Sequence, residues 1–385
     1  MSNQNMFTIN NILPRAKAKM LRELSAYLDS YSLYYNLPPA SKKVQRLSNC
    51  ARIGTNTKII DWIVVPTPSY VEIGNNVELN YLQIKKEKYV FIEHNVQDMD
   101  GLRCDKHCIK TPHNEYLGEN IEGNIVTLSV DFEAGVALSH ATRESWEHLR
   151  RYWSSKECVH RLADLFKKYR IPVTWAICGH LFLESCTGDH GFDEQDWFGD
   201  WFLYDPCSSS QSDSSWYMPD VIEALIKIPD FEIGYHTFGH SRYHYCTEKT
   251  VLRDMELADQ IRKQWGLKFD CFVFPHNECG YFDQLKAGGF KHIRGNIGQL
   301  LPSYGIIDFK DFRFFNTTQM FAPKTMDRCL QQLDCLGSQP ANYYTHCYQW
   351  AEFDGWQKLE EWLLQIAHLR DIGKIIIKKM GDFTL

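Results

Sequence analysis

The chain has 385 residues, too many for one small core, and suits one large domain with an additional segment of roughly 100 residues. Apolar residues make up 44% of the chain and aromatic residues 14%, which excludes a disordered composition. The net charge of −6, together with the lack of a basic stripe, argues against nucleic acid as the main partner.

The sequence also indicates in which cellular compartment the protein is expected. No window approaches the roughly 20 consecutive apolar residues of a membrane span, and the polar stretch 1–11 does not resemble a signal peptide. The 13 cysteines are odd in number and lack paired spacing. We therefore expect a cytoplasmic, reduced protein without a membrane span. The oligomeric state is not predicted.

Residues 1–120 show a different pattern of expected secondary structure from the rest of the chain. Within 1–49, leucines and Tyr27 at helical spacing predict a helix over 16–35, which Pro38-Pro39 ends. Residues 50–120 predict a small β-rich accessory domain. An Ile-Gly-x-Asn unit at 53–56 recurs at 73–76 and resembles coils of a left-handed parallel β-helix. Because coils need neighbours to bury their faces, two copies leave that alternative open.

From residue 121 onward the pattern changes to apolar strands that alternate with amphipathic helices, so residues 121–385 are expected to form one α/β domain. The expected strands are 125–130, 173–178, 231–235, 271–274, 342–345 and 374–378, and the expected helices lie near 159–169, 251–265 and 356–366. Residues 186–216 are interpreted as a long loop, and 296–324 have no assignment. The stretch 131–135 is acidic where a dinucleotide-binding fold needs glycines, which favours a barrel.

Acidic and imidazole side chains follow four of the expected strands. In a barrel, the carboxyl ends of the strands form the active face, so these side chains should meet there. They are Asp131, Glu133, His236, His240, His276 with Asn277, and His346.

His236 and His240 are four residues apart, a spacing at which both rings can bind one metal ion. Two histidines and one carboxylate leave positions open for water, whose pKa a divalent metal lowers toward about 7. Asp131 and Glu133 are then able to divide two roles, one binding the metal and the other taking a proton from the attacking water. The spacing itself does not decide which acid does which.

These motifs together resemble the polysaccharide deacetylase family, carbohydrate esterase family four in its broad sense, and most of all its branch found with bacterial surface-polysaccharide biosynthesis. The resemblance rests on Ser129-Val-Asp-Phe-Glu133, His236-Thr-Phe-Gly-His240, Phe274-Pro-His-Asn277 and Tyr343-Tyr-Thr-His346. It covers about two thirds of the chain. It implies a distorted (β/α) barrel of about seven strands that removes acetyl groups from N-acetylated sugars, with a carbohydrate or sugar conjugate as the partner.

The resemblance also implies roles for individual residues. Asp131 would be the general base, Glu133 would bind the metal beside His236 and His240, and His346 would protonate the leaving amine. The cofactor would be one divalent ion, zinc before cobalt, manganese or nickel. Phe132 separates two acids that are adjacent in the usual motif, so an exchange of their roles stays open.

Two other motifs depart from the family pattern. The third usually carries an arginine beside proline, which orients the base, whereas His276 follows Pro275 here and Arg294 is a distant substitute. The fourth motif, an aspartate near a tryptophan, has no clear counterpart. We expect His276, Asn277, Arg294 and Tyr235 to contact substrate, the last because aromatic rings stack on sugars.

Three alternatives remain open. The first is a hydrolase of a non-sugar amide or cyclic imide on the same barrel, and the second is an inactive carbohydrate-binding relative. The third is an acyltransferase built on the coils of residues 51–80.

Overall fold

The structure is a computed structural model that divides the chain into two compact units, which are treated separately. It describes strands between residues 51 and 110, and residues 123–384 except for 141–142, 193–200, 244–245, 297–304, 310, 318 and 337–339. The helix expected over 16–35 lies outside the described residues. The domain limits at 49 and 120 remain predictions.

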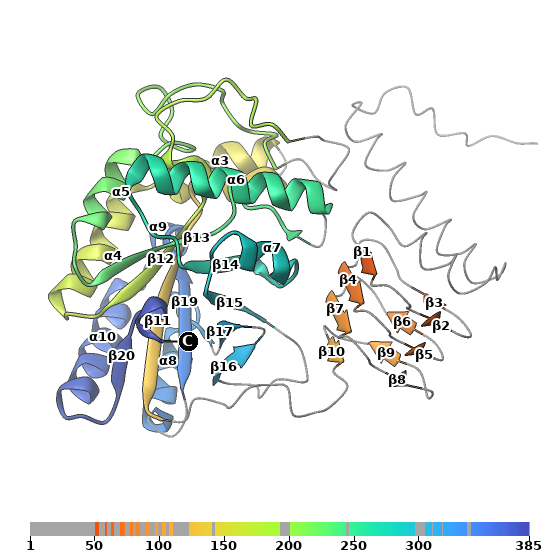
Figure 1. The fold of residues 1–385 in the computed structure, drawn as a ribbon. Coiled ribbons are helices and arrows are strands. Elements are labelled where there is room, and N and C mark those ends of the chain that lie inside the picture. Colours follow the sequence, from red (N-terminus) through yellow and green to blue (C-terminus); the bar gives the residue numbers. More distant parts are fainter. Residues whose placement is uncertain are drawn as a thin grey trace, which may run out of the picture. The chain divides into compact units, whose positions relative to one another are not determined.

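The first unit contains short parallel strands in three sheets (Figure 1). The sheets have the orders β1-β4-β7-β10, β2-β5-β8 and β3-β6-β9, so successive strands pass from one sheet to the next. Ala51 pairs with Val71, and Val71 pairs with Val90, one coil after another. This is the coil arrangement that the repeated Ile-Gly-x-Asn unit suggests. The strands are Ala51–Ile53, Lys58–Ile59, Ile63–Val64, Tyr70–Ile73, Glu78–Leu79, Leu82–Ile84, Tyr89–Ile92, Gln97–Asp98, Leu102–Cys104 and Cys108–Lys110.

The second unit is built on a mostly parallel sheet. Its order is β16-β17-β15-β14-β13-β12-β11-β19-β18, and β20 also pairs with β11. The central strand β11 is buried along its whole length, as its mostly apolar sequence predicts. The strands are β11 Ile125–Phe132, β12 Val173–Ile177, β13 Phe231–Tyr235, β14 Cys271–Glu278, β15 His292–Asn296, β16 Gly305–Phe309, β17 Phe312–Asn316, β18 Gln319–Met320, β19 Ala341–His346 and β20 Ile376–Lys378.

The ends of this sheet meet, so the strands curl into a barrel. Strand β17 pairs with β15 and stops at Asn316, and β18 begins at Gln319 and pairs with β19. The amide Nδ2 of Asn342 on β19 donates to the carbonyls of Gly305 and Asn316, 3.0 Å and 2.8 Å away. Counting β17 and β18 as one position gives seven positions among the described residues. The antiparallel strand β16 distorts the ring. The expected fold class, a distorted (β/α) barrel of about seven strands, is confirmed.

Helices follow most barrel strands and lie outside them (Figure 1). Helix α4 buries Val159, Leu162 and Phe166, the face that the sequence predicts. In the described part of the chain, no helix has the length and apolar content that crossing a bilayer requires. The helices are η2 Ala134–His140, α3 Arg143–Trp153, α4 Lys156–Lys168, η3 Gly179–Phe182, α5 Pro219–Ile226, α6 Glu248–Trp265, α7 Phe282–Ala287, α8 Met326–Gln331, η6 Gln332–Cys335, α9 Cys347–Glu352, α10 Trp356–Asp371 and η7 Met380–Asp382.

Residues 376–384 close the end of the barrel opposite the carboxyl ends of its strands. Strand β20 pairs with the first residues of β11, and the Met380 backbone N–H donates to Thr174 Oγ1 on β12. His292 Nε2 contacts the Phe383 carbonyl at 2.8 Å. The side chains of Met380 and Phe383 join the buried apolar cluster inside the barrel. This segment therefore holds several strands together at once.

Candidate active site

Two carboxylates stand at the carboxyl end of β11. Asp131 belongs to the strand itself, and Glu133 is the first residue after it. Both side chains are only 4% exposed. Buried charges are costly unless other groups compensate them, so their neighbours define what the site does.

The carboxylate of Glu133 faces the two histidines that follow β13. Its Oε1 lies 3.2 Å from His236 Nε2 and 3.0 Å from His240 Nε2. The other ring nitrogen of His236, Nδ1, is 2.8 Å from the Val273 carbonyl, which only accepts, so Nδ1 carries the hydrogen. In the neutral ring, Nε2 then presents a lone pair to a carboxylate. A cation between these atoms removes that repulsion, and a second-shell carbonyl that fixes the tautomer is typical of metal-binding histidines.

The second carboxylate, Asp131, is held by an arginine. Arg294 on β15 places Nη2 2.6 Å from Asp131 Oδ2 and Nη1 2.7 Å from Ser129 Oγ. Its guanidinium also lies 4.6 Å from the centre of the Tyr344 ring. The other oxygen, Asp131 Oδ1, is buried and accepts no hydrogen bond from the described residues. Arg294 thus fixes one oxygen and leaves the other available as a proton acceptor.

His346 stands at the end of β19, opposite both acids. Its Nε2 lies 3.6 Å from Asp131 Oδ2 and 3.6 Å from Glu133 Oε1. These distances exceed those of direct hydrogen bonds. The ring is 17% exposed, more than either acid. Glu133 therefore belongs to two groups that are suited to metal binding, one with His236 and His240 and one with Asp131 and His346.

The charges around the two acids keep both ionised. Burial alone would raise the pKa of Glu133, but the neighbouring imidazoles of His240, His346 and His236 hold that pKa well below its ordinary value. Burial also opposes ionisation of Asp131, and Arg294, foremost among its neighbours, holds the pKa of that carboxyl below its ordinary value. Burial lowers the pKa of His240, which favours the neutral ring that a metal ion needs.

The loops that carry these residues have unusual backbone conformations. Five residues without the freedom of glycine adopt positive φ close to the site: Ala134 (47°), Thr237 (59°), His240 (56°), His276 (56°) and Asn277 (58°). Each such residue costs on the order of 1 kcal/mol or more, and such strain gathers at functional sites. Asp254 on α6 braces one of these loops, because its Oδ1 accepts the Phe238 backbone N–H at 2.7 Å.

The expected substrate-contacting residues divide into two groups. His276 is exposed, and its ring lies 5.4 Å from that of His240, so it borders the site. Asn277, beside it, is partly exposed. Arg294 is engaged with Asp131 instead. Tyr235 is fully buried, and its hydroxyl donates to Asp254 at 2.9 Å, so the expectation that its ring stacks on a sugar is wrong.

Sequence reasoning missed two supporting residues. Ser129 was part of a recognised motif, but its hydrogen bond to Arg294 was not expected. Asp254 accepts from both Tyr235 and Tyr243. An acid among apolar helix positions is a signal for such a buried group. The sequence also provides no signal for a separate group of histidine, cysteine and aspartate side chains, which come from irregular loops.

Comparisons with known proteins bear on the same region. A family model described as polysaccharide deacetylase matches residues 151–282. This stretch includes β12, β13, His236 and His240, whereas Asp131 and His346 lie outside it. No curated protein matches the chain significantly.

Several solved structures are similar to the chain. The PuuE allantoinase is 15% identical, with a TM-score of 0.46, over 70% of this chain and 91% of its own. A family 4 carbohydrate esterase from Bacillus anthracis is 13% identical, with a TM-score of 0.37, over 69% of this chain and 84% of its own. A CE4 family pseudoenzyme from the same organism is 10% identical, with a TM-score of 0.39, over 69% and 67%.

Proposed function

We propose that the barrel unit, whose residues 151–282 match a family model described as polysaccharide deacetylase, is a metal-dependent hydrolase of the acetamide group of an N-acetylated sugar. The substrate class that we propose is a glycan or glycan precursor of bacterial surface-polysaccharide biosynthesis.

One observation carries this proposal: a carboxylate and two imidazole nitrogens converge beside a second carboxylate that is already paired with arginine. Glu133 Oε1 lies 3.2 Å or less from both His236 Nε2 and His240 Nε2. Asp131 has Arg294 as its partner and is therefore not required as a ligand. Three ligands leave coordination positions free for water and substrate, as in catalytic zinc sites.

A divalent ion on Glu133, His236 and His240 would supply a Lewis acid that polarises the acetamide carbonyl and makes water more acidic. The donor set of two imidazoles and one carboxylate suits zinc, with cobalt, manganese and nickel as alternatives. The lone pair of His236 Nε2, which faces Glu133, supports this ligand set.

The other residues of the chain supply the proton transfers. Asp131, ionised beside Arg294, takes a proton from water on Oδ1 as the water oxygen bonds to the acetyl carbon. His346, in its protonated form, donates to the amide nitrogen as the carbon–nitrogen bond breaks. An amide requires this donation because an amine leaves poorly as an anion. Acetate and the free amine result.

The test is acetate release from N-acetylated sugar monomers and oligomers by the full chain reloaded with zinc. We expect release with the wild type and a loss of about 100-fold or more with Asp131→Asn. A non-sugar acetamide and a cyclic imide are run in parallel. If the chain turns over one of these and releases no acetate from any sugar, the sugar deacetylase proposal is wrong. If it binds metal and acts on nothing, the inactive carbohydrate-binding reading stands.

We propose the reducing cytoplasm as the compartment. The support is that the nine cysteines within the described residues are all free thiols, and free thiols persist where disulfides do not form.

A further inference from the structure

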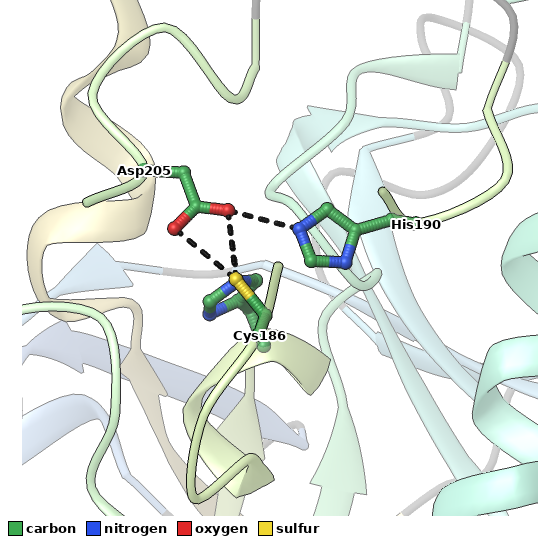
Figure 2. A group of neighbouring side chains, drawn as sticks. Cys186, His190 and Asp205 are labelled. Atoms are coloured by element: carbon green, nitrogen blue, oxygen red, sulfur yellow. Dashed lines mark hydrogen bonds and ion pairs between the residues drawn. The ribbon is translucent and has the colours of Figure 1, made fainter. Parts of the chain in front are cut away.

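A second group of metal-binding side chains lies in the loops that follow β12. It consists of His180 on η3, Cys186 and His190 in the loop after it, and Asp205 farther along the chain. Figure 2 shows the last three, with Asp205 between the cysteine and the histidine side chains that it contacts. Their ligand atoms all lie within 4.8 Å of one another. Asp205 Oδ2 is 2.9 Å from His190 Nε2, 3.3 Å from His180 Nε2 and 3.3 Å from Cys186 Sγ.

The ring of His180 presents a lone pair to this group. Its Nδ1 is 2.9 Å from the Trp216 carbonyl, which only accepts, so Nδ1 carries the hydrogen. Nε2 is buried, makes no hydrogen bond to the described residues and points at the Asp205 carboxylate. The side chain is 0% exposed, so solvent does not relieve the contact. A cation between the two atoms does.

The Asp205 carboxylate is ionised although it is buried. Burial would raise its pKa, but the two imidazoles that face it, those of His180 and His190, hold that pKa far below its ordinary value. Metal ions bind cysteine as the thiolate, so a metal ion that binds Cys186 displaces the thiol proton.

A simple hydrogen-bond network around Asp205 explains only part of the arrangement. Asp205 Oδ1 accepts from the Tyr217 hydroxyl at 3.1 Å and from the Cys207 backbone N–H at 2.9 Å. These bonds account for a buried carboxylate. They do not account for His180 Nε2, which has no hydrogen to donate to Asp205 while its Nδ1 donates to Trp216.

We propose that His180, Cys186, His190 and Asp205 form a structural zinc site. Four ligands complete a tetrahedral shell, as in closed structural sites. Ligands about 2.0–2.3 Å from zinc lie about 3.3–3.6 Å apart, close to the 3.3 Å from Asp205 Oδ2 to His180 and Cys186. One thiolate and one carboxylate also neutralise the charge of Zn²⁺. The mixed sulfur, nitrogen and oxygen set favours zinc over calcium or magnesium.

This zinc site would brace the loop that carries His236 and His240. The backbone N–H of Gly179 donates to the Thr237 carbonyl at 2.9 Å, and that of His180 donates to the Phe238 carbonyl at 3.0 Å. The ring of His190 lies 5.1 Å from that of Phe238. The role is therefore structural and distinct from catalysis, and it does not depend on the proposed reaction.

The test is metal content by mass spectrometry of the full chain, reloaded with zinc under a phosphine reductant that keeps the thiols reduced. We expect about two equivalents in the wild type and one each in Cys186→Ala, His190→Ala and His236→Ala. The exposed histidine His160 on α4 gives the control, His160→Ala, which should keep two. If Cys186→Ala and His190→Ala bind as much zinc as the wild type, the proposal is wrong.

Cobalt substitution gives a readout that needs no Cys186 variant to fold. A thiolate ligand produces a charge-transfer band with Co²⁺ in the near ultraviolet, and the candidate active site has no cysteine ligand. The band should appear in the wild type, in His160→Ala and in His236→Ala. Absence of the band from cobalt-loaded wild type overturns the zinc site, whereas loss of one equivalent in His236→Ala concerns the active site alone.

Discussion

Arg294 Nη2 lies 2.6 Å from Asp131 Oδ2, and the two residues come from strands more than 160 positions apart in the sequence. The same guanidinium binds Ser129 Oγ, so it fixes the orientation of the strand end that carries the acid. An arginine with this role is expected one residue from Pro275. The barrel supplies it from β15, because β15 lies beside β14 in the sheet.

Replacing Arg294 with lysine should weaken the base without removing it. Lysine keeps the charge but cannot bind Ser129 and Asp131 together through a planar fork. The pKa of Asp131 should rise, so the acid limb of the pH profile of kcat/KM should move to higher pH and kcat should fall about 10–100-fold. Arg313→Lys, a buried arginine on the adjacent strand β17, is the control. An unshifted acid limb in Arg294→Lys would contradict the assignment of Asp131 as base.

A metal assay should distinguish a metal ligand from the general base. His236→Ala removes a proposed ligand and should lower the metal content by one equivalent, whereas Asp131→Asn should keep the metal and lose turnover. His160→Ala, an exposed histidine on α4, should change neither. Loss of metal in Asp131→Asn would show that Asp131 is a ligand. The roles of Asp131 and Glu133 would then be shared or exchanged.

The effect of removing His346 should depend on the leaving group. In His346→Gln, amide hydrolysis should fall about 10²–10⁴-fold because nothing protonates the departing amine. Hydrolysis of an aryl acetate, whose phenolate leaves unaided, should fall much less. Parallel kcat/KM measurements on an N-acetylated sugar and an aryl acetate decide this. Equal losses on both substrates would assign His346 to binding or to the metal instead.

Asp254 should make stability depend on pH. Burial raises its pKa to about 6, against the hydrogen bonds from Tyr243, Phe238 and Tyr235. Between about pH 4 and pH 6 the folded state binds more protons at this group than the unfolded state, so the free energy of unfolding falls as pH rises. The loss is on the order of 3 kcal/mol and is complete above about pH 6.

Asp254→Asn should lack this dependence. Urea unfolding of the wild type and the variant at pH 4, 5, 6 and 7 measures the difference. The stability of the wild type relative to the variant should decrease across the series. Asp164→Asn, at an exposed position on α4, is the control. A constant difference between the wild type and Asp254→Asn would mean that this carboxyl titrates normally.

The sequence predicts the barrel strands that are mostly apolar. Residues 125–130 and 173–178 are recognisable because strands that are buried on both faces consist largely of apolar residues. The region 296–324 was not assigned, although it contributes β16, β17 and β18. There the chain turns back at Asp311, which has a φ of 67°. A buried arginine, Arg313, also interrupts the apolar pattern of β17.

The sequence predicts those residues of the candidate site that directly follow parallel strands. Residues just past parallel strands meet at one edge, so Glu133, His236 and His346 were expected together. Tyr235 was misplaced because alternation along a strand decides which face a side chain takes, and that register depends on neighbouring strands. The group around Asp205 was missed because its members come from irregular loops, where the spacing of ligands has no period.

The contacts of residues 376–384 have a consequence for the order of events during protein synthesis. Strands β11, β12 and β15 emerge from the ribosome long before Met380 and Phe383, which fill the space between them. Until those two side chains arrive, the barrel interior keeps a solvent-accessible opening with exposed apolar walls. A chain that lacks this segment is therefore expected to expose apolar barrel walls and to be prone to aggregation.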